Sequence, residues 1–435
     1  MDWLKQYNVV RYSMGDSEIY YSPIGRSYVL AQSGQFEQFM NHGEYKEIFT
    51  PLADYVPIAA QRKVKAPKDY TLLTVLPNNI CNFSCSYCYS AGGRNGAQLS
   101  VKDLEVAIKY FFESKPLGFT RPLTISFMGG GEPMLSWEVV REGIEYAKKL
   151  SQDRGLHLNI RIITNGSVLD EKQLVFIQQE DIAVSVSFEL IPEIQNLQRK
   201  HYDEVYGNIC RLLSYGIPVQ VNATITPSNV ERMTEMVEIL HAHFPAIHNA
   251  MFEPVVGESL FPSPMVMKSF YTRYVGQFIA ARKLADQYEI DLTSFAYLRT
   301  VFPLERACPG EFCITANGDI TGCYCVATKN DPLFIYTKYG AVKQNHIAFD
   351  ISRYKQLLDW NVYTRDECKD CSVKWNCGGG CFHQYQSYSK SFRDEVCFFT
   401  QQFVEHIVRY KVEKFMYRQY GDHVPQFPVL LKEEL

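Results

Sequence analysis

Short apolar runs and amphipathic stretches alternate along the chain from residue 71 onward. Six runs have the length and composition of buried strands, at residues 72–76, 123–128, 158–164, 182–188, 219–225 and 251–255. The stretches between them place apolar residues at helical spacing, at residues 101–112, 137–150, 171–179, 203–213 and 230–243. Buried parallel strands joined by crossover helices give this alternation. The pattern predicts an α/β fold, an open or partial (β/α)6 barrel.

The first 70 residues have a different pattern. Residues 18–23 and 27–31 alternate in hydrophobicity around a short turn, which predicts a hairpin. Residues 36–49 show helical spacing, and the basic stretch 62–70 has the character of a linker. A small N-terminal α+β segment is therefore expected before the barrel.

Composition narrows the class of protein. The 435 residues are 46% hydrophobic and 21% charged, which is ordinary for a globular chain of two or three domains. A net charge of −4 gives no basic surface for nucleic acid, and no apolar run is long enough to span a membrane. The N-terminus lacks the features of a signal peptide, so we expect a cytoplasmic protein. In that reducing compartment, 13 cysteines indicate metal or cluster ligation rather than disulfides.

Three cysteines follow the first predicted strand: Cys81, Cys85 and Cys88. A [4Fe–4S] cluster normally takes one thiolate per iron, so three cysteines leave one iron open to another ligand. The end of a barrel strand is also where active sites gather. The alternatives are a zinc knuckle or scattered buried thiols.

The loops after the next strands carry further motifs. A Gly-Gly-Glu-Pro element, residues 130–133, follows the second strand, and Thr164-Asn165-Gly166 ends the third. Ser187 ends the fourth strand, and Arg199 follows twelve residues later. Glycine permits close approach of backbones, and arginine offers a bidentate fork for a carboxylate. The alternatives are an ordinary glycine turn and a solvated arginine on a helix surface.

Taken together, the cysteine loop, Tyr87 before its last cysteine and the three later motifs resemble the radical S-adenosylmethionine (SAM) superfamily. The resemblance implies that the Cys81/Cys85/Cys88 cluster chelates SAM, whose reductive cleavage yields a 5′-deoxyadenosyl radical that abstracts hydrogen from a substrate. It also implies SAM-binding roles for Tyr87, Gly130, Gly131, Glu132, Pro133, Thr164, Asn165, Ser187 and Arg199. The chain departs from the family at Glu189-Leu190, where Asp-Gly is common.

A second set of cysteines lies between residues 308 and 397 and resembles the SPASM domain. The resemblance implies two auxiliary [4Fe–4S] clusters, and three clusters in all. The first would be held by Cys308, Cys313, Cys323 and Cys381, and the second by Cys368, Cys371, Cys377 and Cys397. Of the other cysteines, Cys325 competes with Cys323 as a ligand, and Cys210 is expected to be a buried structural thiol. For residues 368–381 alone, the alternative is a site like that of a zinc ribbon.

These patterns divide the chain into four expected segments. They are an N-terminal segment (1–70), a radical SAM partial barrel (71–300), a SPASM domain (301–410) and a C-terminal tail (411–435). Many peptide maturases grip the leader of a precursor peptide by strand addition, so residues 1–70 are either such an element or a structural cap on the barrel.

The resemblance favours a maturase that crosslinks or otherwise oxidises a ribosomally made precursor peptide. Its expected partners are that peptide and an external reductant such as flavodoxin or ferredoxin, and Tyr324 or a nearby histidine is a candidate base. One alternative is an anaerobic sulfatase-maturating enzyme that forms formylglycine. It is disfavoured because the cysteine loop begins late, at Cys81, and because Gly129 and Tyr324 stand where those enzymes carry Gln and Asp. The other alternative is an iron–sulfur electron-transfer protein, which leaves residues 130–133 and the Ser187/Arg199 pair unexplained.

Overall fold

The structure is a computed structural model that describes residues 3–32, 34–36, 49, 51–61, 66–307, 310–421 and 428–432. In these ranges, eleven strands form one large sheet, with the order β10-β9-β8-β7-β6-β5-β4-β11-β12-β13-β14. All pairings from β10 across to β11 are parallel. The parallel strands are β4 (Leu72–Val75), β5 (Leu123–Phe127), β6 (Leu158–Thr164), β7 (Ala183–Ser187), β8 (Val219–Ile225), β9 (Asn249–Pro254), β10 (Asp291–Thr293) and β11 (Phe312–Ile314).

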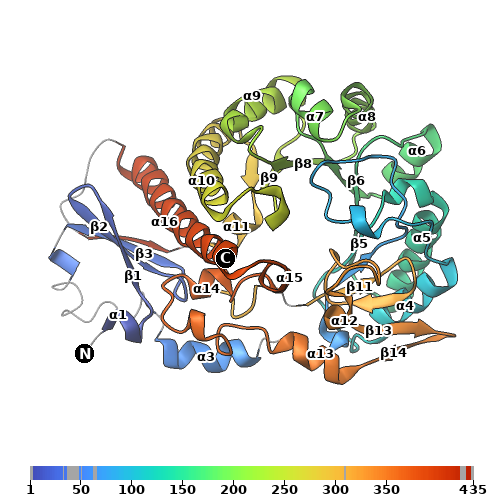
Figure 1. The fold of residues 1–435 in the computed structure, drawn as a ribbon, viewed down its shortest axis with the longest axis horizontal. Coiled ribbons are helices and arrows are strands. Elements are labelled where there is room, and N and C mark those ends of the chain that lie inside the picture. Colours follow the sequence, from blue (N-terminus) through green and yellow to red (C-terminus); the bar gives the residue numbers. More distant parts are fainter. Residues whose placement is uncertain are drawn as a thin grey trace.

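Helices connect the parallel strands and lie along the outer side of the curved sheet (Figure 1). They are α4 (Val101–Glu113), α5 (Trp137–Arg154), α6 (Glu171–Gln179), α7 (Pro192–Gln198), α8 (Tyr202–Ser214), α9 (Met233–His243) and α10 (Pro264–Gln287). The six predicted strands and the five predicted helices are all present. The expected α/β fold with a mostly parallel sheet is therefore confirmed, and β10 adds a further parallel strand.

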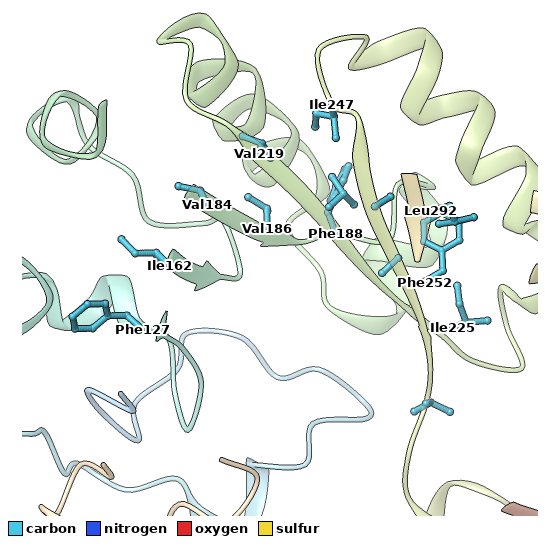
Figure 2. Packing of buried hydrophobic residues seen from close by; sticks show 14 of the residues in the cluster. Phe127, Ile162, Val184, Val186, Phe188, Val219, Ile225, Ile247, Phe252 and Leu292 are labelled. Carbon is cyan, nitrogen blue, oxygen red and sulfur yellow. The ribbon is translucent and has the colours of Figure 1, made fainter. Parts of the chain in front are cut away.

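The two faces of this sheet differ in chemistry. Side chains such as Phe127, Ile162 and Val186 point toward the helices and are fully buried in the main core (Figure 2). On β6, β8 and β9 every second residue points to the opposite face and is partly exposed. That face carries mostly polar side chains, including Thr74, Ser126, Arg161, Ser185, Ser187, Asn222, Thr224 and Glu253. We call it the polar face.

The C-terminal region continues the same sheet. Strand β11 pairs in parallel with β4, and β12 (Asp319–Thr321), β13 (Lys338–Lys343) and β14 (His346–Phe349) follow in antiparallel order. The expected boundary at residue 301 thus does not separate two sheets. The remaining helices of this region are α11 (Phe295–Leu298), α12 (Phe334–Thr337), α13 (Ile351–Leu358), α14 (Lys374–Cys377), α15 (Phe382–Ser387) and α16 (Lys390–Tyr420). The expected start of the tail at residue 411 falls inside α16.

The predicted N-terminal hairpin is present as β2 (Ser17–Ser22) and β3 (Ser27–Gln32). It belongs to a second sheet of order β1-β2-β3-β15, in which β1 (Val10–Met14) and β15 (Val429–Lys432) are the outer strands. This sheet packs on the middle of α16, where Ile19, Tyr21 and Tyr28 meet Val404 and Val408. Helices α1 (Trp3–Gln6) and α3 (Leu52–Gln61) complete the described part. The predicted helix at 36–49 lies almost entirely outside the described residues. Of the expected linker at 62–70, residues 62–65 lie outside them, and Pro67–Asp69 form a short 3-10 helix.

One expected side-chain position is wrong. Cys210 is exposed on α8, whereas Val205, Ile209 and Leu212 form the buried stripe of that helix. Residue 210 follows a buried position directly and therefore points outward, so it is not a structural core thiol. Among the described helices, none has an apolar stretch long enough to cross a lipid bilayer.

Candidate active site

The loop that follows β4 is fixed against the loop that follows β5. The Glu132 backbone N–H donates to the Ile80 carbonyl at 2.7 Å. Asn78 Nδ2 donates to the Glu132 carbonyl at 2.8 Å and to Ser136 Oγ at 2.7 Å. Asn78 is almost fully buried, so these hydrogen bonds hold the start of the cysteine loop in one position.

Glycine is required where the two loops meet. A Cβ atom on Gly131 would lie 2.0 Å from the Ile80 carbonyl oxygen and 2.2 Å from Asn78 Oδ1. Gly130 has a φ of +101°, in the left-handed region that favours glycine. The glycine motif therefore serves close approach of two backbones, and Pro133 then begins a short 3-10 helix, Pro133–Ser136.

Glu132 is a buried carboxylate shared by three donors. Its Oε1 accepts hydrogen bonds from Thr164 Oγ1 at 2.6 Å and from the Met134 N–H at 3.0 Å. Its Oε2 accepts from the Asn165 N–H at 2.7 Å. Burial raises the pKa of Glu132, and these hydrogen bonds oppose that rise. Glu132 thus ties the β5 loop to the end of β6.

The Thr164-Asn165-Gly166 motif in turn reaches the cysteine loop. Asn165 Nδ2 donates to Asn82 Oδ1 at 2.9 Å and lies 4.0 Å from Cys81 Sγ. Asn82 Nδ2 donates to Ser167 Oγ at 2.8 Å. Three motifs that are far apart in sequence therefore meet at the carboxyl ends of β4, β5 and β6.

Each thiol of the loop has an N–H donor beside its sulfur. The Phe83 N–H points at Cys81 Sγ at 3.4 Å, Arg94 Nη2 lies 3.4 Å from Cys88 Sγ, and Arg199 Nη1 lies 3.7 Å from Cys85 Sγ.

This donor set fits thiolates that ligate a metal cluster. Burial raises the pKa of Cys81 and of Cys85, and Arg94 and Arg199, respectively, oppose the rise. Guanidinium groups near the thiols favour the thiolate form that a metal ligand needs. In the part of the chain that the structure describes, no three His, Cys, Asp or Glu side chains converge as ligands of one metal ion. A cluster distributes its thiolates over separate irons, so its ligands need no such convergence.

Arg199 belongs to a buried charged network. Its Nε donates to Glu189 Oε1 at 2.8 Å, and the Tyr87 hydroxyl donates to the same oxygen. Glu189 Oε2 accepts from the Thr224 N–H at 2.9 Å, and the Arg199 guanidinium lies 5.3 Å from the centre of the Tyr87 ring. Burial disfavours the charge of Arg199, but Tyr87, Glu189 and Cys85 together raise its pKa. Ser187, two residues before Glu189, lies at the end of β7 on the polar face.

The C-terminal cysteines that the structure describes lie in two groups. Cys323 contacts Cys325, and Cys323 adds to the effect of burial in raising the pKa values of Cys313 and Cys381. Cys308 lies outside the described residues.

The second group comprises the other four predicted auxiliary ligands. Burial first, and then neighbouring thiols, raises the pKa of Cys377 to about 12 and raises that of Cys397. The thiols that act on both are Cys368 and Cys371. The structure thus brings together the members of each predicted ligand set that it describes.

Tyr324 lies between the first of these groups and the cysteine loop. Its ring is 6.1 Å from that of Tyr89, which follows Cys88 directly. The charge of Cys325 and burial raise the pKa of Tyr324 well above its ordinary value.

Two residues of the polar face escaped the sequence analysis. Burial raises the pKa of Glu253 on β9 to about 7, although the carboxylate accepts the Phe295 N–H at 2.8 Å. Arg161 on β6 has a buried Nε that finds no hydrogen-bonding partner in the described part of the chain. The sequence shows each of them as a charged residue within a strand-like apolar run. It does not show that they are buried, because the elements that cover them are distant in sequence.

Comparison with known proteins gives related sequences over parts of the chain. Residues 75–242 match the radical SAM superfamily. An uncharacterized protein of Methanocaldococcus jannaschii is 28% identical over 38% of this chain and 56% of its own length. A cysteine-type anaerobic sulfatase-maturating enzyme of Clostridium novyi is 20% identical over 72% of this chain and 88% of its own. The radical SAM cyclopropyl synthase TigE of Paramaledivibacter caminithermalis is 26% identical over 29% of each chain. The match thus spans less than two thirds of the first and third of these relatives.

Solved structures share the fold at low sequence identity. Native anSMEcpe with bound AdoMet (SAM) has a TM-score of 0.63 and 15% identity, over 79% of this chain and 99% of its own. SuiB of Streptococcus suis, bound to the precursor peptide SuiA, has a TM-score of 0.52 and 14% identity, over 89% and 100% of the two chains. The chain therefore contains a radical SAM domain and has the radical SAM α/β fold.

Proposed function

We propose that this protein is a radical SAM peptide maturase that abstracts hydrogen from a ribosomally made precursor peptide and installs a crosslink or a related oxidative modification. The observation that carries the proposal is the meeting of the cysteine loop, Glu132, Asn165 and Arg199 at the carboxyl ends of neighbouring strands. The polar face below them is partly exposed, so a substrate can reach it. SuiB, whose structure contains a bound precursor peptide, supports the substrate class, and TigE, a cyclopropyl synthase, supports a bond-forming reaction.

The residues at the strand ends fit SAM and a [4Fe–4S] cluster held by Cys81, Cys85 and Cys88. When bound, the cluster and SAM supply a carbon radical that removes a hydrogen atom from the substrate. Arg199 and Ser187 would hold the carboxylate of SAM, since a guanidinium fork matches a carboxylate. Tyr87 and Glu189 orient that guanidinium. The 130–133 loop, with Glu132, would face the ammonium group of SAM.

The two groups of C-terminal thiols support a SPASM-type region with two auxiliary [4Fe–4S] clusters, completing a partial barrel. Each group contains ligands that the sequence resemblance assigns to one cluster. The contact between Cys323 and Cys325 leaves either one able to ligate. An external reductant such as flavodoxin or ferredoxin would supply the electron that the reaction needs.

A base must be unprotonated when it accepts a proton from the substrate. Tyr324 is poorly suited at neutral pH because its pKa is raised. Glu253 lies on the polar face with a pKa of about 7, close to the value that serves proton transfer at neutral pH. We therefore propose Glu253 as a second candidate base beside Tyr324.

An anaerobic sulfatase-maturating activity is the second candidate function. The relative from Clostridium novyi, which this chain matches over 88% of that protein's length, favours it.

The N-terminal sheet favours the precursor-peptide maturase, because β1 pairs on one side only among the described strands. An edge strand of this kind can add an extended leader peptide through main-chain hydrogen bonds.

Three clusters would give about twelve irons per chain after anaerobic reconstitution, four for each cluster. Replacing Cys81, Cys85 and Cys88 together by Ala should remove about four irons. Cys210→Ala, at the exposed thiol on α8, is the matched control and should leave the iron content unchanged. Iron near four in the unmodified protein, or stoichiometric zinc, would contradict the proposal.

Arg199→Ala should weaken SAM binding by about 1.5–3 kcal/mol, the usual strength of a hydrogen bond to a charged group. Isothermal titration with SAM measures the effect, and iron content checks that the clusters remain. Arg141→Ala, at an exposed arginine of α5 that pairs with Glu145, is the control and should leave SAM affinity unchanged. Unchanged SAM affinity with weaker peptide binding in Arg199→Ala would assign Arg199 to the peptide instead.

Glu253→Gln should stabilise the protein at pH 8 and have little effect at pH 4. The folded protein keeps the carboxyl proton up to about pH 7, whereas the unfolded chain loses it near the ordinary value of 4.5. Over this window the folded state binds more protons, so the free energy of unfolding falls as pH rises. The gain at pH 8 is at most about 3 kcal/mol. Thermal unfolding at both pH values tests this, with the exposed Glu145→Gln as control; equal shifts at both would argue against a raised pKa.

Leader dependence tests the proposed substrate class. The proposal expects a small open reading frame for the precursor beside the gene. Its full-length product should be modified, whereas the core peptide without the leader should react far more slowly. Peptide mass and release of methionine and 5′-deoxyadenosine are measured together. Equal modification of both peptides would refute recognition of a leader. Conversion of a Cys-containing sulfatase peptide to formylglycine, with no change in the precursor, would favour the second candidate function.

A further inference from the structure

Arg161 is a cation on the polar face with no counterion among the residues that the structure describes. It lies in the middle of β6 between Ile160 and Ile162, whose side chains are buried on the opposite, helix-covered face. The strand pleat therefore directs Arg161 toward the polar face, where its side chain is partly exposed.

The absence of a partner distinguishes Arg161 from other buried arginines. Arg199 pairs with Glu189 at 2.8 Å, and Arg282 pairs with Asp291 at 2.9 Å. Arg161 forms no salt bridge with any carboxylate in the described residues, and its buried Nε has no hydrogen-bond partner there. Burial alone lowers its pKa, with no nearby carboxylate to oppose the change. A partly buried charge without a partner destabilises the folded protein, so another role must account for it.

A second unsatisfied donor lies directly beside it. Ser126 on β5 is the register partner of Arg161 on β6, so the two side chains emerge on the same face from adjacent strands. Ser126 is 1% exposed, and its Oγ has no hydrogen-bond partner within the described part of the chain. A buried polar group without a partner is rare in native proteins and calls for an explanation. A guanidinium and a hydroxyl side by side can both donate to one anion.

We propose that Arg161 and Ser126 bind a carboxylate of the peptide substrate. The proposal rests on the function proposed above and gives that substrate a required acidic group, either an Asp or Glu side chain or a C-terminal carboxylate. One guanidinium matches the single charge of a carboxylate and can hold it through two N–H groups. Carboxylates are the anions that an unmodified peptide supplies.

The position of the pair fits a substrate site rather than a SAM site. Arg161 lies three residues before Thr164, the last residue of β6, which is about 10 Å along an extended strand. The cysteine loop and Arg199 meet at the strand ends. A peptide carboxylate bound at Arg161 would therefore anchor the substrate deeper on the polar face. The residue that loses hydrogen would then lie above this anchor, toward the cysteine loop.

The test uses three pools of N-acetylated heptapeptides with randomised flanks. Two pools are C-amidated, one with a central Asp and the other with a central Asn. The third pool has a central Asn and a free C-terminal carboxylate. The full-length, cluster-loaded protein is immobilised anaerobically with SAM, and retained peptides are quantified by mass spectrometry. The wild-type protein should retain one carboxylate-bearing pool about tenfold over the amidated Asn pool, as expected for a hydrogen bond to a charged group. The pool that is favoured identifies the source of the carboxylate.

Arg161→Gln should abolish this preference, and Ser126→Ala should reduce it. Arg141→Gln is the matched control, because Arg141 is an exposed arginine of α5 paired with Glu145 at 2.8 Å. It should keep the wild-type preference. Because Arg161 has no partner among the described residues, Arg161→Gln should not lower the melting temperature, and SAM affinity should remain unchanged.

Three results would overturn the assignment. The first is equal retention of all pools by the wild-type protein. The second is a loss of SAM affinity in Arg161→Gln, which would make SAM the source of the anion. The third is a lower melting temperature in Arg161→Gln with the preference intact, which would make the role structural. Retention is measured without turnover, so these results are separate from those of the leader assay.

Discussion

The contact between the backbones of Ile80 and Gly131 is the constraint on which the candidate site depends. It leaves no room for a Cβ atom, and it sets the distance between the cysteine loop and the loop after β5. Glu132, the next residue, then fixes the end of β6 through Thr164 and Asn165. The Glu132 carboxylate needs hydrogen-bond donors because it is buried. The glycine contact brings Glu132 to those donors, and the hydrogen bonds in turn hold the glycine loop in place. The three loops therefore form one rigid unit rather than three independent segments.

The charged network of Glu189, just after β7, and Arg199, just after α7, extends this unit toward the next strands. Glu189 is completely buried and satisfies its oxygens with Tyr87, Arg199 and Thr224. Arg199 in turn reaches Cys85. Glu189-Leu190 stands where the family resemblance led us to expect Asp-Gly, and the Glu189 carboxylate is the partner that orients the arginine.

The sequence predicted the architecture well because strand alternation and helical spacing are local signals. The β6 and β8 boundaries match the prediction, whereas β10 has three residues and gave no detectable period. The cysteine loop, the glycine motif and Arg199 were found from their spacing together with the resemblance to the radical SAM superfamily. Their contacts were not, since the role of Glu132 as an acceptor for Thr164 depends on two strands meeting. Arg161 was included in an apolar run. Its importance follows from the pleat of β6, which directs it to the polar face, and from the lack of a counterion among the described residues.

The pairing of β3 with β15 has a consequence for how the protein forms. Residues 27–30 of the N-terminal sheet pair with residues 429–432, so these two strands are separated by nearly the whole chain. Contacts of such long sequence separation form late, because the intervening chain must first be ordered. During synthesis the ribosome releases the hairpin long before β15 exists, so the exposed edge of β3 has no partner in that interval. The completed sheet, in which β1 pairs on one side only among the described strands, therefore exists only on a chain that has been made through residue 432, and a shorter product leaves the edge of β3 without β15.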